Sequence, residues 1–132
     1  MKAFLLSVLQ VTVLWGCSSY LVQWHFDESL DAYNESLRWH EWDKASLYAS
    51  DSTVKEFNAR VAAAKDVKVV DYRILKTTYH AEKREATVEV EIDYYKVYAH
   101  MLRTVHDTQE WSFVNEHGTE SWKLLSGFPE FK

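Results

Sequence analysis

The chain has 132 residues, enough for one domain with its own core, and its 47% hydrophobic and 27% charged residues are typical of a folded protein rather than a disordered one. The formal net charge is −5 and Lys83-Arg84 is the only pair of adjacent basic residues, so we expect no nucleic-acid partner. A single cysteine, Cys17, excludes an intramolecular disulfide.

The chain opens with an uncharged, largely apolar run, Ala3 to Trp15, which follows Lys2. A positive residue before an apolar run of this length is typical of an export signal peptide. The run is shorter than the roughly 20 apolar residues that a membrane-spanning helix needs. The alternative is an uncleaved anchor over residues 3–24, although Gln10, Ser18, Ser19 and Gln23 interrupt that longer stretch.

The segment LWGC, at the end of the apolar run, resembles the bacterial lipobox, in which a leucine and a small residue precede a lipid-carrying cysteine. Leu14, Gly16 and Cys17 match this pattern, and Trp15 stands where a small residue is usual. The resemblance implies cleavage before Cys17 and acyl chains such as palmitate on the new amino terminus. Two or more chains give stable membrane attachment. Ser18, by the sorting rule of enteric bacteria, implies an outer-membrane protein that faces the periplasm.

Two helical segments follow the opening stretch. Phe26, Leu30, Tyr33 and Leu37 recur at the spacing of one helix face, and the apolar stripe shifts after Arg38, which predicts a kink or break there. A second helical segment is predicted over residues 51–65, with Thr53 and Glu56 as a capping box.

From Val67 onward the sequence is typical of β-strands, which we predict over residues 67–79, 86–101, 102–116 and 121–128. The apolar phase slips by one residue at Tyr94-Tyr95, which predicts a β-bulge in the second strand. The sequence therefore predicts an α+β fold in which amino-terminal helices pack in a curved, four-stranded antiparallel sheet. The predicted organisation is a signal peptide at 1–16, a lipidated tether at 17–25 and one domain at 26–132.

The stretches AYNESLRWHEWDKASLY and TQEWSFVNEHGTESWKLLSGFP resemble the opening helices and closing hairpin of the nuclear transport factor 2-like superfamily, also called cystatin-like or SnoaL-like. Small bacterial lipoproteins carry this fold. The resemblance implies a cone whose mouth can form an apolar pocket, with an acid-base pair in its isomerase and dehydratase members. The corresponding pocket-wall candidates are Tyr33, Tyr72, Tyr94 and Trp111.

Several polar groups are candidates for catalysis or metal binding. In RWHEWDK, His40, Glu41 and Asp43 lack the two-histidine spacing of a zinc helix. His100 and His106, with Asp107 beside the second, share a strand face only if no turn intervenes near Arg103. Asp71 is the acidic residue closest to an inward position. We therefore predict no catalytic residue, no metal ligand and no cofactor.

The predicted function is a non-catalytic, lipid-anchored envelope protein that binds a small apolar ligand or a protein partner. One alternative is a small enzyme of the ketosteroid isomerase or dehydratase type, with an acid-base site in the cone mouth. Another is a structural component of an envelope assembly that forms homodimers through its sheet.

Overall fold

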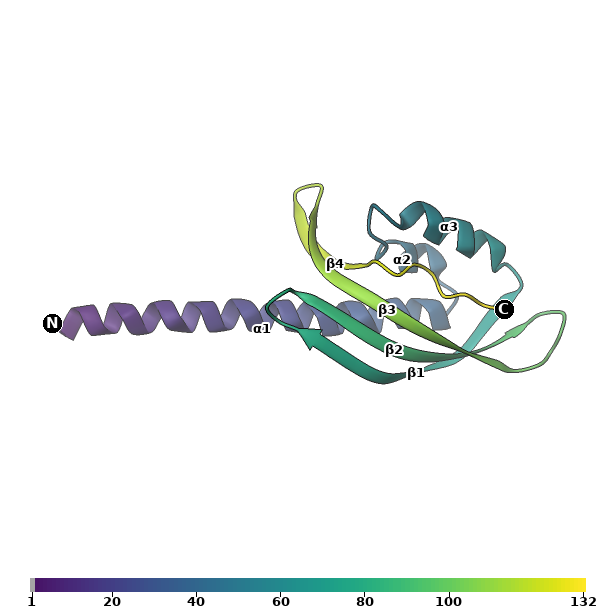
Figure 1. Ribbon diagram of the computed structural model, residues 1–132, viewed down its shortest axis with the longest axis horizontal. Helices are drawn as coiled ribbons and strands as arrows, with labels where there is room; N and C mark the ends of the chain where they lie inside the picture. The colour runs from purple at the N-terminus through teal and green to yellow at the C-terminus, as the bar shows by residue number, and fades with distance from the viewer. Residues whose placement is uncertain (1) are drawn as a thin grey trace.

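The computed structural model describes the backbone of residues 2–132 and the side chains of residues 20–132. The predicted α+β fold is confirmed: helices from the amino-terminal half pack against an open, four-stranded antiparallel sheet (Figure 1). The elements are α1 (Lys2–Arg38), α2 (Trp42–Ser46), α3 (Val54–Ala63), β1 (Val67–His80), β2 (Glu85–Lys96), β3 (Arg103–Glu116) and β4 (Thr119–Leu124).

Helix α1 lies along the concave side of the sheet and extends beyond it toward the amino terminus (Figure 1). The predicted apolar face is buried, with Phe26, Tyr33 and Leu37 each at most 1% exposed. The helix ends at Arg38, as the shift of the apolar stripe predicts. Leu14, Gly16 and Cys17 fall within its helical backbone, but their side chains lie outside the described residues. Within residues 20–132, no helix is long and apolar enough to cross a bilayer.

The strands form a meander in the order β1-β2-β3-β4, as predicted. Alternation along β2 buries Val88, Val90 and Ile92 completely. The neighbouring positions face outward, where Arg73 of β1 binds Asp93 at 2.7 Å and Glu91 at 3.1 Å. The outer face of the sheet is therefore charged.

Two local predictions were wrong. The pairing of β2 with β3 runs unbroken from Glu85 to Tyr94, and the register shifts lie in β1 at Val70 and Leu75. The change of apolar phase after Tyr94 marks the approaching end of β2 rather than a bulge. Thr53 does precede α3, but its hydroxyl donates to backbone carbonyls outside that helix, including that of Leu124, so no capping box forms.

The core is a cluster of aromatic rings between α1, the sheet and the carboxyl-terminal segment 125–132. The ring of Trp111 lies 5.5 Å from that of Tyr33, and the rings of Phe57 and Phe128 are 5.3 Å apart. The Leu125 amide donates to the Glu110 carbonyl beside β3, and the Phe128 carbonyl accepts a bond from an Arg60 guanidinium nitrogen at 2.9 Å. Segment 125–132 thus closes the side of the core that β4 leaves open.

Candidate functional site: an inward-facing polar cluster

Three side chains of β3 point toward α1 because residues two apart on a strand share a face. Asp107, Gln109 and Trp111 lie opposite Val90, Val88 and Ala86 of β2, which are all buried. Gln109 is 0% exposed and Trp111 is 1% exposed. The chain therefore places two polar side chains on a strand face that is otherwise apolar.

Helix α1 supplies the partners of this polar pair. The Gln109 amide nitrogen donates to the Asn34 side-chain oxygen at 2.8 Å and to an Asp107 carboxylate oxygen at 3.2 Å. The Gln109 oxygen accepts a bond from the Trp111 indole nitrogen at 3.2 Å. We call Tyr33, Asn34, Asp107 and Gln109 the interior polar cluster. Its buried amides are satisfied, which fixes their orientation.

Asp107 is the titratable acid of the cluster. Burial raises the pKa of its carboxyl from 3.8 to about 6, although the bond from Gln109 and the positive charges of His106 and Arg60 act in the opposite direction. A carboxyl group with a pKa in this range exchanges its proton near neutral pH. Asp107 can therefore accept or donate a proton on the concave side of the sheet.

Tyr33 lies in the same cluster with a hydroxyl that has no hydrogen-bond partner within the described part of the chain. Its side chain is 0% exposed. Burial, followed by the negative charge of Asp107, holds the pKa of the Tyr33 phenol well above its usual value. The hydroxyl therefore stays protonated and is available as a donor or acceptor.

The four predicted pocket-wall residues do not form one wall. Tyr33 and Trp111 meet in the cluster, whereas Tyr94 packs on Phe131 with ring centroids 4.9 Å apart and donates to the Lys132 carbonyl. Tyr72 is half-buried and donates to a Glu35 carboxylate oxygen at 3.1 Å.

The other polar candidates from the sequence lie outside the interior polar cluster. A ring nitrogen of His40 lies 3.1 Å from the Val67 carbonyl oxygen, and its ring stacks on Trp42. His100 and His106 are exposed, and Asp71 is exposed and pairs with Arg38. Residues 20–132 contain no group of three acidic, histidine or cysteine side chains placed to bind a metal ion.

Sequence reasoning missed Gln109 and Asn34, and it considered Asp107 only as the neighbour of His106 rather than as an inward-facing acid. The signal was the position of Trp111, because a large aromatic residue in a strand is expected inside and the residues two and four positions earlier then share its face. For Asn34 the signal was its place beside Tyr33 on the buried side of the helix.

Two shallow depressions mark the surface near these elements. One, of about 260 Å³, lies between α3 and segment 125–132 and is lined by Arg60, Ala63, Ala64, Pro129, Glu130 and Phe131. The other, of about 280 Å³, lies on the charged outer face between β1 and β2 and is lined by Lys76, Thr78, Thr87 and Glu89. Arg60 links the first depression to the interior polar cluster, because its charge acts on Asp107.

The unpartnered Tyr33 hydroxyl gives a direct prediction. Tyr33→Phe removes a buried polar group without disturbing the ring, so we expect the free energy of unfolding to stay the same or rise by about 1 kcal/mol. Urea denaturation followed by tryptophan fluorescence measures this. Tyr94→Phe, which breaks the bond to the Lys132 carbonyl, is the matched control and is expected to lose about 1 kcal/mol. A loss from Tyr33→Phe as large as that from the control would contradict the prediction.

Comparison with solved structures shows the fold of the chain. A SEC-C motif containing protein from Psychrobacter arcticus superposes with a TM-score of 0.60 at 13% identity, covering 80% of this chain and 61% of that one. A SEC-C motif containing protein from Rhodopseudomonas palustris gives a TM-score of 0.54 at 12% identity, covering 74% of this chain and 72% of that one. This chain therefore spans about three fifths of the length of the first of these proteins.

No family model matches the chain, and no curated protein matches it. The assignment to lipoproteins with a nuclear transport factor 2-like domain is therefore wrong, since the solved structures it resembles are SEC-C motif containing proteins. The physical reason is that a broken helix and a closing aromatic hairpin suit many α+β meanders, so they do not identify one family. At 12–13% identity the likeness shows the architecture alone.

Proposed function

We propose that the protein is a non-catalytic envelope protein, lipid-anchored at Cys17 and facing the periplasm from the outer membrane, that binds a small ligand at the interior polar cluster. The observation that carries the ligand-binding part is the fully buried Tyr33 hydroxyl, which has no partner among the described residues and lies within the electrostatic reach of Asp107. Buried polar groups in native proteins are nearly always hydrogen-bonded. A ligand with a hydrogen-bonding group supplies the partner that the Tyr33 hydroxyl lacks, next to the carboxyl of Asp107.

The surroundings of the cluster favour a ligand that is mostly apolar. Tyr33, Tyr48 and Trp111 present neighbouring rings, with centroids 5.5 to 6.2 Å apart, and apolar walls with a few polar groups are typical of ligand sites. Because aromatic side chains fill the interior, we expect the ligand to enter by displacing part of segment 125–132, next to the depression at Arg60.

Native mass spectrometry of the full-length gene product, extracted from bacterial membranes in mild detergent, tests this proposal. We expect a bound mass on the wild-type chain that is lost from Asp107→Asn and Tyr33→Phe. Glu120→Gln, which removes an exposed charge on β4, is the control and is expected to keep it. A wild-type chain with no bound mass, or equal occupancy in all variants, would argue against a ligand at this cluster.

The same carboxyl group supports a second candidate, acid-base catalysis. A pKa of about 6 suits a group that accepts and returns a proton near neutral pH, and the Tyr33 phenol could stabilise developing negative charge. If the extracted molecule is converted on incubation, its rate should change with an inflection near pH 6. Asp107→Asn should abolish that conversion while the molecule still binds. If the bound molecule is instead released chemically unchanged, the result would favour ligand binding without catalysis.

The charged outer face does not favour dimerisation through the sheet. Arg73 of β1 pairs with Asp93 and Glu91 of β2 on the outer surface of these strands. These charged side chains do not provide the apolar surface that stable homodimers bury. A sheet-to-sheet homodimer is therefore not part of the function that we propose.

Membrane attachment has its own test. Cys17→Ser removes the thiol that would form the thioether, and we expect the chain to remain unprocessed or to leave the membrane fraction. Fractionation and intact-mass measurement of the wild type and the variant give the result. Ser18→Ala is the matched control, because it changes the neighbouring side chain and keeps the thiol. Unchanged processing and membrane association of Cys17→Ser would reject the lipid anchor.

A further inference from the structure

Where α1 leaves the folded body, three large side chains are exposed. Tyr20, Leu21 and Trp24 are 69%, 51% and 46% exposed. Positions three and four residues apart lie on one side of a helix, so these side chains form a patch on a single turn. The opposite side of the same turn carries Val22 and Phe26, which pack on the body. We call Tyr20, Leu21 and Trp24 the collar.

The body holds this helix turn in a fixed position. The Trp122 indole nitrogen donates to the Val22 carbonyl at 2.9 Å, and the ring of Phe26 lies 4.9 Å from that of Trp122 and 5.7 Å from that of Tyr79. The β1–β2 and β3–β4 turns lie at this same end of the molecule, and the β2–β3 turn lies at the other (Figure 1). The collar therefore has a defined place relative to the whole fold.

The distribution of charge changes at the collar. All 20 acidic residues follow Phe26, whereas residues 1–26 contain none. Asp27, Glu28 and Asp31 are exposed on α1 directly after Trp24. Tryptophan and tyrosine are enriched where a protein crosses from lipid to water, and acidic side chains are disfavoured next to anionic lipid. The collar has the composition of such a boundary.

We propose that the collar lies in the interfacial layer of the membrane to which the chain is attached, so that the body is held against the bilayer with its β2–β3 turn pointing away. This inference rests on the membrane attachment proposed above. Cys17 and Trp24 are seven residues apart, about 10 Å along a helix, which keeps the collar close to the lipid that would be attached at Cys17. Their spacing also places both positions on one side of α1.

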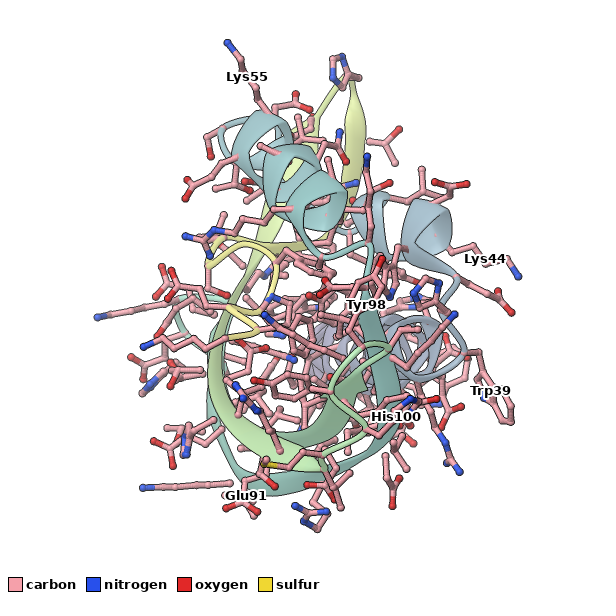
Figure 2. All side chains as sticks on the ribbon, turned by 90° about the vertical axis from the view of Figure 1, so that its right-hand side faces the viewer. Trp39, Lys44, Lys55, Glu91, Tyr98 and His100 are labelled. Atoms are coloured by element: carbon pink, nitrogen blue, oxygen red, sulfur yellow. The ribbon has the colours of Figure 1, made fainter. Side chains whose placement is uncertain are left out.

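The β2–β3 turn supplies a matched control. Tyr98 and Leu102 are 86% and 62% exposed, so they resemble the collar in size and exposure. Figure 2, which looks at the end of the molecule away from the amino terminus, shows Tyr98 and His100 facing the viewer. Side chains of this turn should remain in water if the collar rests in lipid.

The test uses full-length chain purified from membranes and reconstituted in phosphatidylethanolamine and phosphatidylglycerol vesicles. Leu21→Cys, Trp24→Cys, Tyr98→Cys and Leu102→Cys are labelled with a small fluorophore, with the wild type as the background for Cys17. We expect bromine-labelled acyl chains to quench the two collar labels, and aqueous iodide to quench the two turn labels about tenfold more strongly than the collar labels, because the interface excludes the anion.

Three results would overturn the proposal. Equal iodide quenching at all four positions places the collar in water. Collar labels shielded from both quenchers, with energy transfer between labelled chains, identify the collar as a contact between copies. The lipid attachment itself is contradicted if the protein does not co-float with the vesicles, or if the fluorophore labels the Cys17 thiol of the wild type. Flotation together with an iodide-accessible collar rejects only the present inference.

Discussion

Replacing Asp107 by asparagine is expected to raise the free energy of unfolding by about 2 kcal/mol more near pH 7 than near pH 4. The carboxyl has a pKa of 3.8 when exposed and about 6 when folded. Between these values the folded chain holds a proton that the unfolded chain has released, so stability falls as pH rises through this window. Above pH 6 the wild type carries the whole cost of ionising Asp107 in the folded state. The pKa difference corresponds to about 3 kcal/mol, and we lower this to about 2 kcal/mol because Asp107 is only half-buried and partly screened by solvent.

The measurement is a series of urea denaturation curves for the wild type and Asp107→Asn across this pH range. The difference between the two proteins isolates Asp107 from other titrating groups, such as Asp93, whose pKa is lowered by its bonds to Arg73 and Thr104. Glu120→Gln, which also removes one negative charge, should show no such trend. A difference that stays flat with pH would mean that Asp107 titrates as an exposed carboxyl. Greater stability combined with lost ligand binding would be typical of a functional residue.

Replacing Gln109 by leucine is expected to lower the free energy of unfolding by about 3 kcal/mol. The substitution keeps a side chain of similar size but removes the donor to Asn34 and Asp107 and the acceptor for the Trp111 indole nitrogen. These groups are then left in a buried environment without that partner, which costs more than the loss of one average hydrogen bond. Denaturation at about pH 7 measures the effect.

A double-mutant cycle with Asn34→Leu distinguishes lost hydrogen bonds from lost packing. If the two side chains depend on each other, the loss in free energy of unfolding of the double variant should be smaller than the sum of the two single losses by about 1 kcal/mol or more. Thr108→Val is the control, because it alters an exposed neighbour on β3. Strict additivity, or a loss from Gln109→Leu no larger than that of the control, would indicate that water already reaches these amides.

The sequence predicts the architecture well where the apolar pattern is regular. The recurrence of Phe26, Leu30 and Tyr33 identifies the buried face of α1, and the alternation in β2 identifies its inward side. These patterns follow directly from helix and strand geometry. The order of the strands then follows from the short turns, which allow only antiparallel neighbours.

The interior polar cluster could not be found from the same patterns, because it breaks them. The inward face of β3 carries Asp107 and Gln109 between Val105 and Trp111. The alternation of apolar residues along β3 therefore does not show which of its faces points inward. The meeting of Asn34 with Gln109 joins positions 75 residues apart. Neither composition nor spacing reports such a contact. The register shift of β1 at Leu75 was missed for a similar reason, since the side chains of an edge strand need not alternate strictly.

The closure of the core by segment 125–132 affects how the chain would cross a membrane. Phe128 is 1% exposed and packs on Phe57 and Trp42. The Lys132 carbonyl accepts bonds from Tyr94 and Arg103. A chain that is still being synthesised lacks these contacts, and its aromatic interior stays open to water. We therefore expect such a chain to stay unfolded until segment 125–132 has emerged, which would suit the export proposed above.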